Sequence, residues 1–289
     1  MPWRAADLPD QAGRTFVVTG ANSGLGEATA RELAARGAHV ILACRNVAKG
    51  EEVAATMSGE VAVRPLDLAD LASIRAFAKV TGDIDVLINN AGVMAIPKRR
   101  TSDGFEMQIG TNFLGHFALS GLLLPKISSR VVTLSSFAHR MGRIDLSDLN
   151  WHTRRYRRWA AYGQSKLADL IFAMELQRRL SLTQSVVISV AAHPGYAATE
   201  LQSHTESVQD KVMAFGNRLL AQPASAGALP TLYAATMPDV IGGDYWGPGG
   251  LGEMRGMPTK VGTARAARDT ALAAKLWHTA EALTGVSFL

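Results

Sequence analysis

A glycine-rich segment near the N-terminus limits most strongly what this chain can fold into. Thr19 to Gly26 reads TGANSGLG and follows the apolar run Phe16 to Val18. This pattern predicts a strand, a tight turn and the start of a helix. The glycines at 20, 24 and 26 let the backbone come close to a ligand, because they carry no Cβ atom. Unpaired N–H groups at the helix start point at the same turn, so we expect it to bind a diphosphate.

Apolar runs and helical patterns alternate along the rest of the chain. We expect strands at residues 14–19, 38–43, 61–66, 86–88, 130–134 and 186–191, and a last short strand within 242–250. We expect helices at residues 24–36, 47–57, 71–80, 104–124, 162–180 and 264–283. Strands separated by helices predict βαβ crossovers, and no linker divides residues 1–289. The expected fold class is therefore α/β: a single-domain Rossmann fold with a doubly wound parallel sheet of about seven strands, flanked by helices on both faces.

Composition excludes several classes of protein. Cys44 is the only cysteine, which rules out an internal disulfide and a cysteine metal cluster. The N-terminus lacks the apolar core of a signal peptide, and the longest apolar stretch is too short to span a bilayer. We therefore expect a cytoplasmic protein with no integral membrane span. The net charge of +5 is not concentrated on one element, so no nucleic-acid partner is expected.

The densest basic segment is RRYRRW, from Arg154 to Trp159. We expect its arginines, Arg154 to Arg158, to lie in a solvated loop or at a helix entry. Contact of this cluster with a membrane or a partner stays open at the level of the sequence.

Polar residues follow each predicted strand, at the edge of the sheet where ligands of open α/β sheets bind. Arg45 follows the second strand in place of the acidic residue that would select NAD, which favours the 2′-phosphate of NADP(H). Asp67 is expected to accept a hydrogen bond from the adenine, and the segment Asn89 to Gly92 is expected beside the nicotinamide ribose. Two serines, Ser135 and Ser136, follow the fifth strand, and His193-Pro194-Gly195 follow the sixth.

Tyr162 and Lys166 lie four residues apart on a predicted helix, on one face and one turn apart. A free phenol has a pKa of about 10, and a neighbouring ammonium group favours its ionised form. The tyrosine is therefore a candidate general acid for a carbonyl oxygen or general base for an alcohol. A hydroxyl from Ser136 is a candidate to hold the substrate oxygen.

The ordered motifs TGANSGLG, Asp67-Leu68, NNAG, Asn112, the serine, YGQSK and PGYAAT resemble the short-chain dehydrogenase/reductase family from Arg14 to about Thr199. The resemblance implies a catalytic tetrad of Asn112, Ser136, Tyr162 and Lys166, with Ser135 as the alternative serine. Asn112 would support a water that links Lys166 to solvent, and Lys166 would bind the ribose hydroxyls. The resemblance implies this set of NADP(H)-binding residues: Gly20, Asn22, Ser23, Gly24, Leu25, Gly26, Arg45, Asp67, Leu68, Asn89, Ala91, Gly92, Tyr162, Lys166, Pro194, Gly195 and Thr199.

The chain resembles the branch of this family that contains retinol dehydrogenases and protochlorophyllide reductase, through an insertion from Ala138 to Trp159 together with Ala43-Cys44-Arg45 and His193-Pro194-Gly195. This resemblance implies a lipophilic or bulky carbonyl or alcohol substrate, with a lid at residues 194–221. Candidate lining residues are Phe137, His139, Tyr156, Trp159, Tyr196 and Met213, for which ordinary packing is the alternative role. The family usually forms homodimers or homotetramers through the helices that hold Asn112 and Tyr162, and the sequence leaves the oligomeric state open.

Three alternatives to this hydride-transferring enzyme are a zinc enzyme, a non-catalytic sensor and an epimerase. No histidine spacing typical of a zinc site occurs, so no metal is expected, and His193 is expected to support the turn before Pro194. A non-catalytic dinucleotide-sensing protein is the alternative function, although such proteins often lack the tyrosine or the lysine. An extended-branch epimerase fits poorly, because such chains typically carry a different glycine spacing in the turn.

Overall fold

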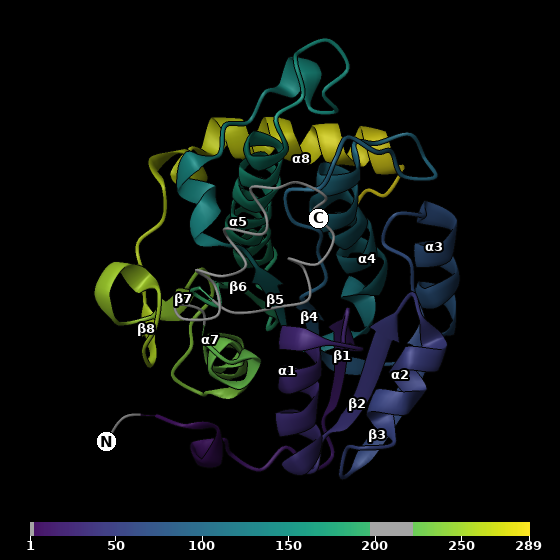
Figure 1. The fold of residues 1–289 in the computed structure, drawn as a ribbon, viewed down its shortest axis with the longest axis vertical. Coiled ribbons are helices and arrows are strands. Elements are labelled where there is room, and N and C mark those ends of the chain that lie inside the picture. Colours follow the sequence, from purple (N-terminus) through teal and green to yellow (C-terminus); the bar gives the residue numbers. More distant parts are fainter. Residues whose placement is uncertain (1–2, 197–221) are drawn as a thin grey trace.

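The computed structural model describes residues 3–196 and 222–289 and shows one sheet with helices on both faces (Figure 1). The strands are β1 (Thr15–Thr19), β2 (His39–Cys44), β3 (Glu60–Pro65), β4 (Ile84–Asn89), β5 (Ile127–Leu134), β6 (Ile188–Ala192), β7 (Tyr245–Pro248) and β8 (Pro258–Lys260). They lie in the order β3-β2-β1-β4-β5-β6-β7-β8. All neighbours are parallel except β8, which runs antiparallel to β7. The chain direction across the sheet reverses between β1 and β4, which is the point where doubly wound sheets bind their ligands.

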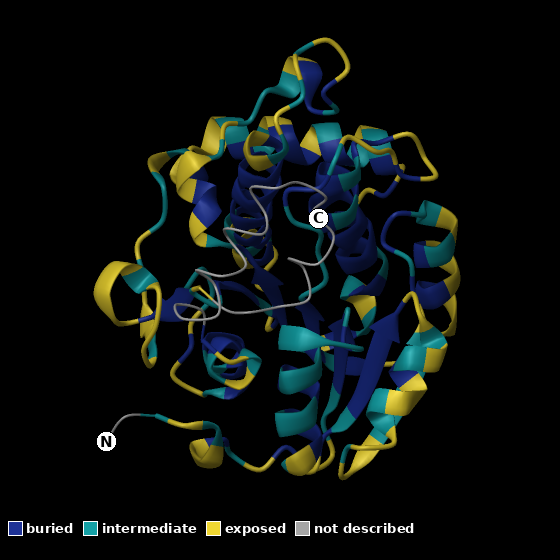
Figure 2. Ribbon diagram, in the orientation of Figure 1, coloured by how far each residue is buried: buried dark blue, intermediate teal, exposed yellow. Residues whose placement is uncertain are grey.

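The α-helices are α1 (Gly24–Ala35), α2 (Val47–Ala54), α3 (Leu71–Val80), α4 (Gly115–Leu123), α5 (Arg158–Leu182), α7 (Ala224–Thr236) and α8 (Thr270–Thr284). Shorter helices are η1 (Ala5–Asp7), η2 (Ile109–Leu114), η3 (Leu124–Lys126), η4 (Phe137–Met141), η5 (Leu146–Asp148), η7 (Leu251–Glu253) and η8 (Arg265–Arg268). Successive strand residues point to opposite faces of the sheet, so the sheet has two separate cores. One core packs against α1, α2 and α7, and the other packs against α3, α4, α5 and α8. The strands between them are buried throughout most of their length (Figure 2).

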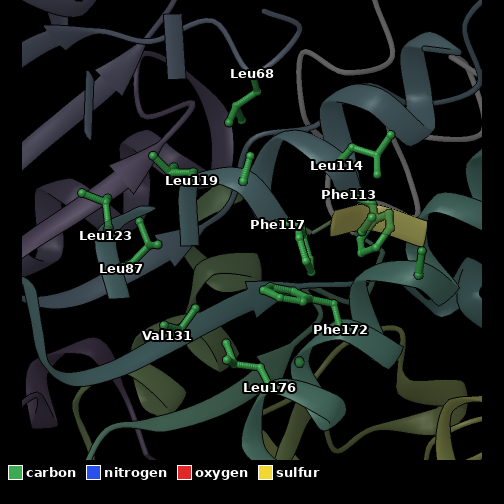
Figure 3. Packing of buried hydrophobic residues seen from close by; sticks show 14 of the residues in the cluster. Leu68, Leu87, Phe113, Leu114, Phe117, Leu119, Leu123, Val131, Phe172 and Leu176 are labelled. Carbon is green, nitrogen blue, oxygen red and sulfur yellow. The ribbon is translucent and has the colours of Figure 1, made fainter. Parts of the chain in front are cut away.

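The second of these cores is rich in aromatic side chains. Phe113, Phe117 and Phe172 lie together between α4 and α5 (Figure 3). Trp277 of α8 packs on them, with its ring centroid 5.0 Å from that of Phe117 and 5.9 Å from that of Phe172. Helix α8 therefore lies across α4 and α5 and covers this face within the same chain (Figure 1).

The predicted fold is confirmed, with three differences. The sheet has eight strands rather than about seven, because β8 is a three-residue edge strand too short to show a pattern. The sequence prediction missed α7, whose small residues and internal Pro230 are weak helix signals. The helix predicted at 104–124 begins later, as the π-helix η2 that continues into α4.

The chain around the predicted lid is described only at its ends. Thr199, Met213 and most of the predicted lid lie outside the described residues. Within the described ranges, 3–196 and 222–289, no helix is both long and apolar enough to cross a membrane.

Candidate active site

The turn between β1 and α1 is packed so closely at its glycines that larger residues would not fit there. Gly20 and Gly24 have φ angles of +65° and +58°, which favour glycine. A Cβ on Gly26 would collide with the carbonyl oxygen of Gly20 and lie 2.5 Å from Nδ2 of Asn90. Asn22, Ser23 and Leu25 are half-buried around the turn. The N-terminus of α1 thus presents backbone N–H groups on an open surface, which suits a diphosphate.

A hydrogen-bonded chain links this turn to the end of β4 and to the π-helix. The hydroxyl of Thr19 accepts hydrogen bonds from the backbone N–H groups of Asn90 and Ala91, both at 2.9 Å. It lies 2.9 Å from Nε2 of His116, whose Nδ1 is 2.7 Å from the carbonyl oxygen of Asn112. Since that carbonyl can only accept, Nδ1 carries the proton and Nε2 accepts from the threonine. Burial lowers the pKa of His116 to about 3, so the ring is neutral.

Asn112 lies in the π-helix η2 and is completely buried. Its side chain bonds both backbone groups of Val93, with Oδ1 accepting at 2.8 Å and Nδ2 donating at 3.0 Å. Nδ2 also donates to the hydroxyl of Ser165 at 2.9 Å. The extra residue per turn of a π-helix is common at functional sites, and here it brings Asn112 to the segment that follows β4. A Cβ on Gly92 would lie 3.1 Å from Oδ1 of Asn112 and 3.7 Å from Nζ of Lys166.

Tyr162 and Lys166 lie in the first turns of α5 and are both more than nine-tenths buried. Nζ of Lys166 donates to the carbonyl oxygen of Leu134 at 2.9 Å and to Asp169 at 2.8 Å. Burial lowers the pKa of the Lys166 ammonium group. The charge of Asp169, and then that of Tyr162, outweighs this effect, so the pKa is raised overall. The ring of Tyr162 packs edge-on against Trp159 at 6.1 Å. This helix face therefore holds a permanent cation near a phenol.

The two serines after β5 differ in their surroundings. Ser135 is buried, and its hydroxyl donates to the carbonyl oxygen of Lys166 at 2.8 Å. Ser136 is half-buried and caps η4 by accepting from the N–H of Ala138 at 3.2 Å. Ser136 is thus the serine with a hydroxyl at the surface of the site, whereas Ser135 fastens α5 to the sheet.

The residues predicted for the adenosine and ribose ends are spread along the same sheet edge. Arg45 is exposed after β2, and Asp67 is half-buried after β3, where its carboxylate accepts from the N–H of Ala69. Leu68 is buried in the core. Asn89 is also buried, and its side chain donates a hydrogen bond to the hydroxyl of Ser120 at 2.9 Å, inside the protein.

The segment after β6 forms a turn supported by His193. Nδ1 of His193 accepts from the N–H of Gly195 at 3.2 Å, as expected for a residue that supports this turn. Burial lowers the pKa of His193 to about 3, and the ring lies 3.2 Å from Glu253. Pro194 and Gly195 are half-buried, and Gly195 has a φ of +68°. Among the residues that the structure describes, no group of histidine, cysteine and acidic residues could hold a metal ion.

The predicted lining residues have mixed roles. Phe137 and Trp159 are 46% and 42% exposed, and Tyr196 is partly exposed. His139 is buried, and its Nδ1 lies 2.7 Å from the carbonyl oxygen of Ser136. The hydroxyl of Tyr156 lies among buried polar groups and donates to Glu106 at 2.9 Å, so it has a structural role.

The arginine cluster lies at the entry to α5, as the sequence predicted. Arg154 stacks over the ring of Trp151 at 3.6 Å and bonds Asp148. Arg155 and Arg157 are exposed. Part of this cluster therefore holds the insertion together.

A family model described as short chain dehydrogenase matches residues 14–210. The chain belongs to the short-chain dehydrogenase family. It is 44% identical to human retinol dehydrogenase 13 over 95% of this chain and 85% of that protein. A crystal structure of a protein of uncharacterised function from Mycobacterium paratuberculosis is 53% identical, covers 100% of both chains and has a TM-score of 0.88.

A more distant structure holds a cofactor. It is described as an NAD(P)-dependent gluconate 5-dehydrogenase from Beutenbergia cavernae with bound NADP. It is 26% identical over 82% of this chain and 95% of that chain, with a TM-score of 0.61. This chain is therefore an oxidoreductase of the short-chain family, retinol dehydrogenase-like in sequence, with a site for a nicotinamide cofactor.

Sequence reasoning missed several residues of this site. Thr19 and His116 connect the turn to the π-helix, and Asp169 pairs with Lys166. Two features of the sequence could have indicated Asp169. It lies three residues after Lys166 on the same helix face, and it is a charged residue in an otherwise apolar helix segment.

Proposed function

We propose that this chain is an NADP(H)-dependent oxidoreductase that transfers hydride between the nicotinamide and a carbonyl or alcohol carbon. The observation that carries the proposal is the buried Lys166 ammonium group near Tyr162 on α5, at the sheet edge where the glycine turn opens. A buried cation next to a phenol favours proton release by that phenol. A binding protein without catalysis has no need of this arrangement, so the sensor alternative is disfavoured.

The residues present fit a dinucleotide. A Cβ at Gly26 would collide with Gly20 and Asn90, and one at Gly92 would crowd Asn112, so the glycines let the backbone pack closely at the turn and after β4. We assign the diphosphate to the N–H groups of Ser23 to Gly26, the ribose beside Gly92 and Lys166, and the nicotinamide end to the segment from Pro194 to Thr199. When bound, NADP(H) supplies or accepts the hydride.

Tyr162 moves the proton. In reduction its hydroxyl gives a proton to the carbonyl oxygen of the substrate, and in oxidation its phenolate takes one from the alcohol. We assign Ser136 to hold the substrate oxygen, because its hydroxyl lies at the site surface whereas that of Ser135 is occupied inside. Lys166 stabilises the phenolate, and Asn112 fixes the backbone around Val93 beside it.

The proposed substrate is lipophilic or bulky. Phe137 and Trp159 present exposed aromatic surface beside Ser136 and Tyr162, and such surface binds apolar ligands. A relative named for retinol, a lipophilic alcohol, supports the same class. The test is a spectrophotometric screen of NADPH oxidation with aldehydes, ketones and quinones of increasing apolar size. Turnover that falls as the apolar part grows would contradict the substrate class.

The preference for NADP(H) rests on Arg45. A guanidinium group binds a phosphate by charge-assisted hydrogen bonds, and Arg45 is exposed where the adenosine ribose would lie. Arg45→Asp should weaken NADPH binding by about 10- to 100-fold and leave NADH binding unchanged or improved. NADH serves as the internal control in the same titration. Equal losses for both cofactors would remove Arg45 from the 2′-phosphate.

We also propose that the chain does not pair through α4 and α5. Helix α8 covers these two helices through Trp277, where the family's usual partner helices would have to pack. Light scattering should therefore give a monomer, or a dimer that persists when the half-buried Leu122 of α4 and exposed residues of α5 are changed to glutamate.

A further inference from the structure

Asp169 is a buried carboxylate that none of the family motifs includes. It lies one turn after Lys166 on α5, and its Oδ2 is 2.8 Å from Nζ of Lys166. Only 1% of the Asp169 side chain and 7% of the Lys166 side chain are exposed. Its second oxygen, Oδ1, is buried without a hydrogen-bond partner. A buried acid with an unsatisfied oxygen costs stability, so its presence calls for a role.

The contacts of Lys166 show what the carboxylate does. An ammonium group has three donors, and two of them point to Asp169 and to the carbonyl oxygen of Leu134. The space beside Gly92 lies next to the same nitrogen, because a Cβ there would be 3.7 Å from Nζ. Asp169 thus holds the ammonium group from within the protein and leaves the remaining donor for the ligand side.

The Asp169 carboxylate also affects the charges close to Lys166. Burial raises the pKa of Asp169 to about 6 despite the neighbouring Lys166, so the pair is ionised above that pH. Within residues 3–196 and 222–289, the other titratable groups that interact with Lys166 are Tyr162 on α5 and His116 on α4, and His116 is neutral. Tyr245 of β7 in turn interacts with Tyr162. Above pH 6 the described part of the site therefore places an ion pair, Lys166 and Asp169, beside neutral phenol and imidazole groups.

We propose that Asp169 is a positioning residue for the proposed reaction: it anchors the Lys166 ammonium group and keeps it charged beside Tyr162. This inference rests on the proposed function, because it assigns a role to the proton transfer by Tyr162. Burial lowers the pKa of Lys166, and the contact with Asp169 opposes this effect. Removal of the carboxylate charge should therefore weaken the positive charge that favours proton release by the phenol.

The test is the pH profile of kcat/KM for alcohol oxidation in the full chain. Wild-type activity should rise with pH to a plateau, and Asp169→Asn should move this rise to higher pH by about one unit, because Lys166 then loses its anchor and part of its positive charge. A shift to lower pH would overturn the proposal. Asparagine keeps the shape of the side chain. Asp169→Ser removes the same charge in a smaller side chain and should move the rise in the same direction, so that a folding defect in one variant does not leave the test without a result.

Glu175→Gln is the matched control. Glu175 is another buried acid on α5, about 9 Å beyond Asp169 along the helix axis at 1.5 Å per residue, and it pairs with Arg178 and Arg179. Its removal should change stability without moving the pH profile.

The outcomes separate the two proposals. A wild-type chain without turnover, or a Tyr162→Phe variant with full turnover, would contradict the proposed function. A wild-type profile that depends on Tyr162 but is unchanged in both Asp169 variants would overturn the role of Asp169 alone. The same shift in Glu175→Gln would also overturn it, because the effect would then be general to buried charge on α5.

Discussion

The glycine turn from Thr19 to Gly26 and the first turns of α5 form the candidate site in opposite ways. The turn is made of backbone and small residues, and a single Cβ at Gly26 would collide with its neighbours. The α5 segment is made of polar side chains, Tyr162, Lys166 and Asp169, that are buried, and the last two form an ion pair. In the proposed function the first region binds the cofactor through closely packed backbone, and the second provides the charges for proton transfer.

The two regions should therefore tolerate different kinds of substitution. The turn should fail when volume is added, because its function depends on close approach of the backbone. The α5 segment should fail when charge or a proton is removed, even if the volume is unchanged. His116 connects the two regions through Thr19 and the carbonyl oxygen of Asn112.

Gly26→Ala is expected to give the largest effect on binding. The added methyl group would collide with the carbonyl oxygen of Gly20 and the side chain of Asn90, so the turn must shift and its N–H groups lose their positions. NADPH affinity should fall by at least about 100-fold, with a loss of about 1–3 kcal/mol in unfolding free energy from overpacking. Fluorescence titration and urea unfolding measure both. Gly82→Ala is the control, since a Cβ at Gly82 meets nothing within 4 Å, and a similar loss in that variant would refute the steric account.

The serine pair provides a test of intermediate size inside the second region. Ser136→Ala should lower kcat by about 10- to 100-fold, because it removes a hydroxyl at the site surface, and should lower the unfolding free energy by about 1 kcal/mol, because the cap of η4 is lost. Ser135→Ala should lower the unfolding free energy by a similar amount, because its buried hydrogen bond to Lys166 is lost, but should leave kcat near the wild-type value. Steady-state kinetics and urea unfolding of both variants decide the matter. The reverse pattern would make Ser135 the catalytic serine.

The link between the regions predicts a smaller, pH-dependent effect. Burial lowers the pKa of His116 to about 3 in the folded chain, whereas an unfolded histidine titrates at about 6.5. The unfolded state therefore gains protons first as pH falls, and the stabilisation is lost progressively from pH 6.5 down to about 3. His116 should contribute a loss of about 2 kcal/mol between pH 7 and 5.

His193, with its pKa also near 3, should add a similar loss, and Asp169 should offset part of it because its pKa is raised to about 6. Urea unfolding at the two pH values should show a shallower decline in His116→Gln than in the wild type. An equal decline in both would mean that His116 is not held neutral by the fold.

The sequence predicted the turn well because every constraint on it is local. Strand, glycines and helix start lie within eleven residues, and the φ angles of Gly20 and Gly24 agree with the expected turn. The positions of six further strands were equally accessible, since each contains a short apolar run. The edge strand β8 was missed because pairing with β7, rather than its own three residues, makes it a strand.

The second region was only partly predictable. The spacing of Tyr162 and Lys166 was visible, but the choice between Ser135 and Ser136 depends on which hydroxyl is buried, and alternation along one strand end cannot show that. Asn89 was predicted beside a ligand, yet its side chain points to Ser120 in the interior. The π-helix at Asn112 could not be predicted from the sequence, because the change from α to π hydrogen bonding has no short sequence pattern.

The most direct test of the account measures binding and hydride transfer in the same preparation of Tyr162→Phe. The variant lacks only the hydroxyl, so NADPH should bind with wild-type affinity through the glycine turn, while turnover of the best carbonyl substrate falls by at least about 100-fold. Wild-type turnover in this variant would contradict the assignment of Tyr162, and loss of NADPH binding would contradict the separation of binding from chemistry.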